Sequence, residues 1–284
     1  MAHQNNIELV DNTLTLLPRN LGTLLNETFS IFGKHLWSFV GLVAITQVPL
    51  SLLSMFLLQL FDGEGNGGLG SLAAVFVLGV LGNMLTYAAV VYAVSQQYLT
   101  RGIMIRTCYY RVWWKIISLV MIAVAFSATM LTVYVLPSLV DGYWSLLFAA
   151  MLTVPALALT IYWAMAVQAV IIEGYKAIEA LKRSLNLVRG SWWRIFGITI
   201  VLSLVVVGLG ILVKLPFGLA IAAFGAAEGS LPSNIWVMLS DMIIMIAVLP
   251  VLFIAGTLLY YDVRVRKEKY DLATLSRELE MVLV

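Results

Sequence analysis

The stretch 257-TLLYYDVRVRKEKYDLATL-275 passes from apolar to charged within a few residues. Six of the eight residues 262–269 are charged, although only 11% of the whole chain is. The segment before it, 235–261, is interrupted by a single charge, Asp241. A helix of ~20 apolar residues crosses the ~30 Å hydrocarbon core of a bilayer. The pattern therefore predicts the end of a membrane-spanning helix, with Tyr260 and Tyr261 at the headgroup layer, rather than a catalytic or ligand-binding box.

The composition of the whole chain agrees with a membrane protein. Of the 284 residues, 62% are hydrophobic and 11% are charged. Soluble domains average ~45–50% apolar and ~25% charged residues. The single cysteine, Cys108, excludes an intrachain disulfide, and an inert thiol is favoured there over a reactive or acylated one.

Long uncharged or nearly uncharged stretches predict an all-α fold, a polytopic bundle of six transmembrane helices. Alternation typical of a membrane β-barrel is not seen. The apolar piece 215–227 is too short to cross and is expected to be interfacial or re-entrant. We expect a flexible segment over 1–18, a membrane domain over 19–261 and a charged tail over 262–284. The expected spans are 36–61, 71–99, 116–140, 143–172, 195–213 and 235–261.

The basic residues predict the orientation of these spans. With six alternating spans, sixteen of the seventeen lysines and arginines fall on one side, and Lys214 is the exception. Loops rich in lysine and arginine stay in the cytoplasm. Both termini are therefore expected on the cytoplasmic side of the cell membrane.

An internal repeat adds detail to this architecture. The stretches 21-LGTLLNETFSIFGKHLWSFVGL-42 and 177-AIEALKRSLNLVRGSWWRIFGI-198 align without gaps and pair Trp37 with Trp193. A weaker copy is 105-IRTCYYRVWWKIISL-119. Each predicts an amphipathic interfacial helix followed by a span, which gives three helix-plus-hairpin units. In 177–188, the apolar stripe is expected to contain Ile178, Leu181, Leu185 and Val188.

The tail predicts one more amphipathic helix over 271–283. Leu272, Leu275, Leu279 and Val282 recur at helical spacing. Asp262 or Glu268, in the charged run before it, is expected to pair with the basic interfacial helices.

Few residues in the sequence suggest a catalytic, metal-binding or ligand-binding site. Two histidines and no metal-ligand, P-loop or nucleophile-elbow motif predict neither a metal nor a cofactor. Asp241 is the candidate intramembrane polar site, either paired with Lys214 or exposed with it at the interface. Gln47, Asn83 and Gln168 are expected to make interhelical hydrogen bonds. The candidate lipid-headgroup or topology contacts are Arg183, Arg189, Arg194, Arg264, Arg266 and Lys267.

Two stretches resemble a known family. These are 179-EALKRSLNLVRGSWWRIFGI-198 and 249-LPVLFIAGTLLYYDVRVRKEKYDL-272, which are similar to the membrane domain found beside some bacterial glycerophosphoryl diester phosphodiesterases. The likeness extends over about residues 15–275. It implies a six-span bacterial or archaeal membrane protein, and it brings no phosphodiesterase activity, because the catalytic residues of that enzyme lie in a separate soluble barrel.

Three functions remain open. A non-enzymatic membrane scaffold, assembly factor or lipid-organising module is favoured. The alternative is a small transporter or channel subunit with Asp241 in its pathway, and a membrane-embedded lipid enzyme is the least favoured. The expected partner is the lipid bilayer, with anionic lipids as the candidate contact; nucleic acid is not expected.

Overall fold

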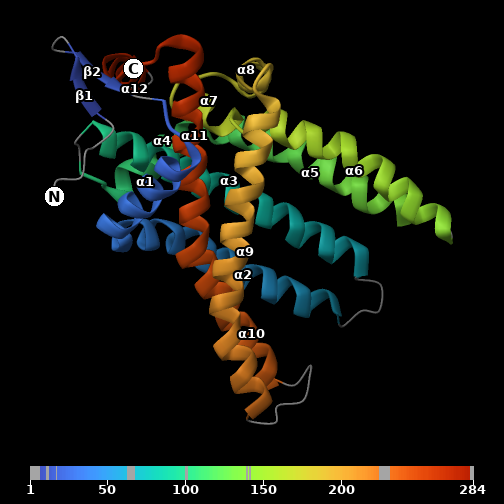
Figure 1. Cartoon of the computed structure of the whole chain (residues 1–284). Helices are drawn as coiled ribbons and strands as arrows, with labels where there is room; N and C mark the ends of the chain where they lie inside the picture. Colours follow the sequence, from blue (N-terminus) through green and yellow to red (C-terminus); the bar gives the residue numbers. More distant parts are fainter. Residues whose placement is uncertain are drawn as a thin grey trace.

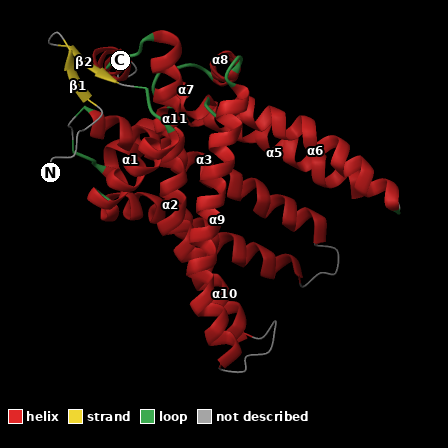
Figure 2. Ribbon diagram, viewed as in Figure 1, coloured by secondary structure: helices red, strands yellow, loops and turns green. Residues whose placement is uncertain are grey.

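The computed structural model describes residues 7–10, 13–16, 18–62, 68–99, 102–138, 140, 142–223 and 231–281. Helices dominate this part of the chain, with one short β-hairpin near its start (Figure 2). Six helical segments are long and apolar enough, by length and composition, to cross a membrane. The predicted number of spans is confirmed, and the fold is consistent with a multi-pass membrane protein.

The six segments form three helical hairpins that diverge from a common end (Figure 1). Most of the buried side chains gather where the hairpins converge, and large apolar side chains are exposed along their outer parts. The first hairpin consists of α2 (Leu36–Asp62) and α3 (Gly68–Tyr98), the second of α5 (Ile116–Ser138) and α6 (Tyr143–Trp163), and the third of α9 (Trp192–Ala223) and the last span.

The last span is one long helical path with a change of pitch. It runs through α10 (Leu231–Ile243), the π-helical segment η1 (Ile244–Val248) and α11 (Leu249–Glu268). The wider turns end just before Pro250, which has no N–H to continue the α-helical ladder. Helix α11 contacts α1, α3, α8 and α9, so it forms the centre of the fold.

Three short helices each lead directly into a hairpin. They are α1 (Leu21–Lys34), α4 (Ile105–Trp114) and α8 (Ala177–Val188). Each buries one face: α1 packs on α11, α4 on α3, and α8 on α6 and α7 (Ala166–Ile171). In α8, however, Ile178 and Leu185 of the predicted apolar stripe are exposed, because Ala177, Ala180 and Ser184 occupy the contact with the bundle.

One expected boundary is wrong, and one expected span contains a turn. The apolar piece 215–227 does not form a separate segment over its described part, because α9 continues unbroken to Ala223. The fourth span covers Tyr143–Ile171, close to the expected 143–172, and contains a turn at Ala164 and Met165 between α6 and α7. Ser184 stabilises this turn, because its hydroxyl accepts from Met165 N at 3.0 Å and donates to Tyr162 O at 2.7 Å.

The two ends of the chain also contain regular structure. The segment expected to be flexible includes an antiparallel hairpin of β1 (Ile7–Val10) and β2 (Thr13–Leu16). Strand β2 contacts α12 (Leu272–Met281), the amphipathic helix predicted for the tail (Figure 1). The predicted stripe is confirmed for Leu272, Leu275 and Leu279, which are buried, while Val282 lies outside the described residues.

The polar residues predicted within the spans do make interhelical hydrogen bonds. Gln47 Nε2 donates to Asn83 Oδ1 at 3.2 Å and joins α2 to α3. Gln168 Nε2 donates to the hydroxyl of Tyr87 and, at 3.3 Å, to the carbonyl oxygen of Gly256. A Cβ at position 256 would lie 2.4 Å from the Tyr87 hydroxyl oxygen, so this contact of α3 with α11 requires glycine.

Candidate functional site

The charged end of α11 is buried among other helices, and so are Tyr260 and Tyr261, which the sequence predicted at the headgroup layer. The chain stays helical to Glu268, and the residues from Tyr260 to Arg264 are all buried. A charged side chain is costly to bury unless it is paired and hydrogen-bonded. Here α1, α8, α9 and α12 supply the partners. We call this group the clasp; it contains Arg19, Glu27, Glu173, Arg183, Arg194, Asp262, Arg264, Arg266, Glu268 and Glu278.

Asp262 organises one half of the clasp. Its fully buried carboxylate pairs with Arg194 of α9 at 2.6 Å and with Arg266, one turn along α11, at 3.0 Å. It also accepts a hydrogen bond from the backbone N–H of Arg19 at 2.6 Å. Arg194 and Arg266 in turn donate to the carbonyl oxygen of Arg19, at 3.1 and 2.8 Å. This arrangement fixes the backbone before α1 against α9 and α11.

The side chain of Arg19 extends this half to α3. Its Nε lies 2.5 Å from a carboxylate oxygen of Glu27, and a terminal nitrogen donates to the Tyr98 hydroxyl at 3.0 Å. Tyr98 also donates to Glu27, which closes a three-residue ring of hydrogen bonds. Burial alone would lower the pKa of Arg19, but the neighbouring Tyr98, Glu27 and Asp262 raise it above its ordinary value. Arg19 therefore stays charged.

Arg264 organises the other half. Both of its terminal nitrogens bind Glu278 of α12, at 2.7 and 2.8 Å, and Nε binds Glu268 at 3.0 Å. The guanidinium carbon lies 3.7 Å from the centre of the Tyr270 ring, and the Tyr270 hydroxyl donates to Glu278 at 2.7 Å. Such a planar, bidentate and stacked site suits arginine and not lysine. Burial and the nearby charges raise the pKa of Tyr270, which keeps this hydroxyl a donor.

Arg183 connects α8 to this second half. It binds Glu173 at 2.9 Å and Glu268 at 2.5 Å. Tyr260 donates its hydroxyl proton to Glu173. Burial would lower the pKa of Arg183, but its bond to Glu268 and the charge of Glu173 raise it well above the ordinary value. The prediction that Asp262 or Glu268 pairs with one of the basic amphipathic helices is met by Glu268, which binds Arg183 of α8, whereas Asp262 pairs with Arg194 of α9 and Arg266 of α11.

Lys267 acts differently from its arginine neighbours. Its Nζ donates to the carbonyl oxygens of Asn186 and Arg189, at 3.3 and 2.5 Å. These carbonyls lie at the C-terminal end of α8, where backbone oxygens lack helical partners and a cation is favourable. Lys267 therefore caps α8 from α11.

The clasp accounts for most of the candidate headgroup contacts. Arg264 is buried, so it cannot reach a headgroup, and Arg183, Arg194 and Arg266 each pair with carboxylates. Of the other two, Lys267 binds the backbone carbonyls at the end of α8, and Arg189 is exposed without an ion pair among the described residues. Sequence reasoning missed Arg19, Glu27, Glu173 and Glu278. The signal available for Glu173 was its place directly after an uncharged span, on a side otherwise rich in cations.

Of the two alternatives for Asp241 and Lys214, the ion pair is present at the far end of the third hairpin, and both side chains are also exposed. Lys214 Nζ lies 2.9 Å from Asp241 Oδ1, and these side chains are 55% and 48% exposed. The pair joins α9 to α10 on the outside of the bundle. Neither Lys214 nor Asp241 lines the cavity between α3 and α4.

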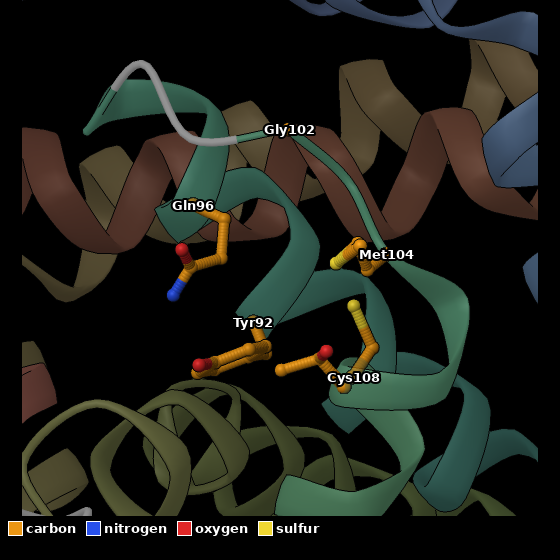
Figure 3. A pocket seen from close by; sticks show the side chains of 6 residues that line it. Tyr92, Gln96, Gly102, Met104 and Cys108 are labelled. Atoms are coloured by element: carbon orange, nitrogen blue, oxygen red, sulfur yellow. The ribbon is translucent and has the colours of Figure 1, made fainter.

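A cavity of about 250 Å³ lies between α3 and α4 (Figure 3). Tyr92 and Gln96 face it from α3, and Met104 and Cys108 face it from the beginning of α4. Burial raises the pKa of Cys108 to about 12, so the thiol stays protonated near neutral pH. A buried, protonated thiol is a poor nucleophile. The lining residues are Tyr92, Gln96, Gly102, Met104, Thr107 and Cys108.

The clasp contains five arginines and five carboxylates, so its charge is balanced, and each of its carboxylates binds at least one arginine. Within the described residues, no group of three or more histidine, cysteine, aspartate or glutamate side chains could hold a metal ion. What the arrangement can do is join five helices, α1, α8, α9, α11 and α12, and the backbone before α1 through charge. Compared with known proteins, the chain matches no family model, no curated protein and no solved structure.

Proposed function

We propose that the chain is a multi-pass protein of the cell membrane with both termini in the cytoplasm. The clasp end carries sixteen of the seventeen basic residues when the six spans alternate. That excess agrees with the rule for cytoplasmic loops. The clasp would then lie on the cytoplasmic side and the tips of the hairpins on the opposite side.

Two ion pairs support a placement for the bilayer. Arg194 and Asp262 join α9 to α11 at the clasp, and Lys214 and Asp241 join the same hairpin near its tip. The residues between the pairs, 195–213 and 242–261, are all uncharged. The pairs are about 20 residues apart along each helix, or ~30 Å, which matches the thickness of the hydrocarbon core. We call them the clasp pair and the far pair.

We extend the proposal to three repeated units, each an interfacial helix and a hairpin. Exposed tryptophans at the three junctions support it. Trp37 follows α1 and is 81% exposed, Trp113 and Trp114 end α4, and Trp193 begins α9 at 78%. Indole rings favour the headgroup layer. Trp37 and Trp193 are also the residues that the internal repeat aligns.

The proposed role is a non-enzymatic scaffold, assembly or lipid-organising module. The observation that carries it is the clasp: within the described residues, three of the four buried charged side chains, Arg19, Asp262 and Arg264, belong to it and hold helices together. The transporter alternative depends on Asp241, which binds Lys214 and faces outward instead of into the bundle. Membership of the glycerophosphoryl diester phosphodiesterase membrane-domain family fits this role and remains a proposal.

Labelling of single cysteines tests the topology. In a Cys108→Ala background, Asn26→Cys and Asn186→Cys lie at the clasp end, and Ser138→Cys and Ser145→Cys lie near a hairpin tip; Asn26, Asn186 and Ser138 are exposed, and Ser145 is partly exposed. A membrane-impermeant maleimide applied to intact cells should label the second pair only. Labelling of the first pair alone would reverse the proposed orientation.

Reconstitution tests the role. Purified protein in liposomes should leave proton and potassium gradients and small-solute contents unchanged relative to empty liposomes. Flux that Asp241→Asn abolishes would favour the transporter instead.

A further inference from the structure

The basic residues in and near α8 fall into two groups: some are bound by other groups of the protein, and others are exposed. Arg183, Arg194 and Lys267 are held by carboxylates or backbone carbonyls. Lys182 and Arg189 are exposed, and neither makes an ion pair within the part of the chain that the structure describes. These two cations are free to bind something outside the molecule.

They share an edge of α8 with exposed apolar side chains. Ile178, Lys182, Leu185 and Arg189 follow one another at intervals of four, three and four residues, which places them along one line of a helix. Ile178 is 60% exposed and Leu185 is 37% exposed. By helical periodicity, the polar Glu179 and Asn186 lie to one side of this line and the partly buried Leu181 to the other. The edge therefore has an apolar flank next to a basic one.

Contacts with α11 fix how α8 is rotated about its own axis and how far it lies from the proposed membrane. Arg183 binds Glu268 and Lys267 caps the helix, so the edge is held facing away from the bundle. Glu268 lies six residues beyond Asp262 on α11, or about 9 Å further from the hydrocarbon boundary marked by the clasp pair. That height is just outside the headgroup layer, which extends ~5–7 Å beyond the hydrocarbon. With the membrane placed as proposed, side chains of α8 that point toward it are long enough to reach the headgroup layer.

We propose that this edge of α8 binds the headgroups of anionic phospholipids in the cytoplasmic leaflet. Ile178 and Leu185 pack into the headgroup layer, and Lys182 and Arg189 contact the phosphates. The inference rests on the membrane placement proposed above. Charge complementarity selects this occupant: the edge contains two cations and no acidic residue, and a basic amphipathic helix at a membrane surface favours anionic lipid. The neighbouring Trp193, 78% exposed, marks the same layer.

Lipid binding by the detergent-solubilised protein tests the basic flank. Native mass spectrometry would titrate the full chain with phosphatidylglycerol and, separately, phosphatidylcholine. Each basic residue near an anionic surface contributes ~1 kcal/mol, so Lys182→Gln with Arg189→Gln should weaken phosphatidylglycerol binding about 30-fold and leave phosphatidylcholine unchanged. The preference should also fall as salt is raised.

A second double variant controls for the loss of two positive charges from the protein. Lys269→Asn with Arg277→Gln removes two exposed cations beside and within α12, and asparagine suits the left-handed backbone of residue 269, where φ is 53°. This control should keep its phosphatidylglycerol affinity within about 2-fold, as surface charges away from the lipid do. Equal losses in the two double variants, or no loss in the first, would overturn the proposed site.

A fluorescent probe tests the apolar flank separately. In the Cys108→Ala background, an environment-sensitive dye on Leu185→Cys should emit at shorter wavelength in phosphatidylglycerol liposomes than the same dye on Glu179→Cys. Identical, water-like emission at the two positions would place the edge in solvent and overturn the proposal. The proposal would also be overturned if the Lys182→Gln, Arg189→Gln double variant lost binding to an acidic protein partner while its lipid binding stayed unchanged. The six-span topology, measured by cysteine labelling, would survive either result.

Discussion

The third hairpin contains two ion pairs that differ in almost every respect but distance. Arg194 and Asp262 lie 2.6 Å apart, and Lys214 and Asp241 lie 2.9 Å apart. Asp262 is fully buried and has three nitrogen partners, whereas Asp241 is 48% exposed and pairs with Lys214. Exposed pairs contribute little to stability, while removing one member of a buried network leaves a charge without compensation. Position in the fold therefore decides what a charge does.

The largest effect is expected at Arg264, the most connected residue of the clasp. Arg264→Ala leaves Glu278, Glu268 and Glu173 without their shared cation. Removing one partner of a buried ion pair costs about 3–5 kcal/mol. The free energy of unfolding, measured by denaturant titration in detergent, should fall by that amount.

Arg264→Lys sharpens this result. Lysine keeps the charge but cannot bind Glu278 with two nitrogens or stack on Tyr270. We expect it to recover only part of the loss. Full recovery would mean that charge alone, and not the geometry of the guanidinium, holds α12.

Asp262→Asn should have the next largest effect. The amide cannot pair with Arg194 and Arg266, although both arginines are partly exposed and can be hydrated. Loss of hydrogen bonds to a charged group costs about 1.5–3 kcal/mol. Hydrogen exchange should show faster opening of α1, because Asp262 also accepts from the backbone of Arg19. Unchanged protection of α1 would argue against this connection.

A smaller effect is expected at the cap of α8. Lys267→Met removes the amine that binds Asn186 and Arg189 carbonyls and keeps most of the apolar side chain. A cation at a helix C-terminus contributes about 0.3–1 kcal/mol. The last turn of α8 should exchange its amide protons faster, with little change in the melting temperature of the protein.

Acid should weaken the first turn of α12. Asp271 accepts hydrogen bonds from the backbone and side chain of Thr274, and these bonds lower the pKa of Asp271. Because its pKa is lower when folded, its contribution is present above ~4 and is lost as pH falls through the folded value. Amide exchange in α12 should rise below pH 4. Asp271→Asn, which keeps a neutral cap, should remove this pH dependence.

The smallest effect is expected at the far pair. Asp241→Asn should change the free energy of unfolding by less than about 0.5 kcal/mol, as is common for exposed pairs. The same denaturant titration in detergent measures it. A loss as large as that of Asp262→Asn would remove the contrast between the two pairs.

Sequence patterns predicted the features that depend on chain length, charge and period. Six helices long enough to span a membrane, the buried stripe of α12 and the Lys214–Asp241 pair are all present. These predictions succeed because they need only local information: how many uncharged residues occur in a row and which residues share a helix face. The separate segment at 215–227 failed because no local signal distinguishes the continuation of an apolar helix from a new one.

The sequence by itself determined that the chain has six apolar helices and where its cations gather. The tertiary structure decided which cations face outward and which are buried in the clasp. Arg19 meets Asp262, and Arg264 meets Glu173, across large separations in the chain. Helical period predicts the face of a helix on which a charge lies, and it contains no information about the helix packed against that face. Burying a single charge is costly unless an oppositely charged side chain lies next to it. Helix packing brings these partners together, so the clasp exists only in the folded protein.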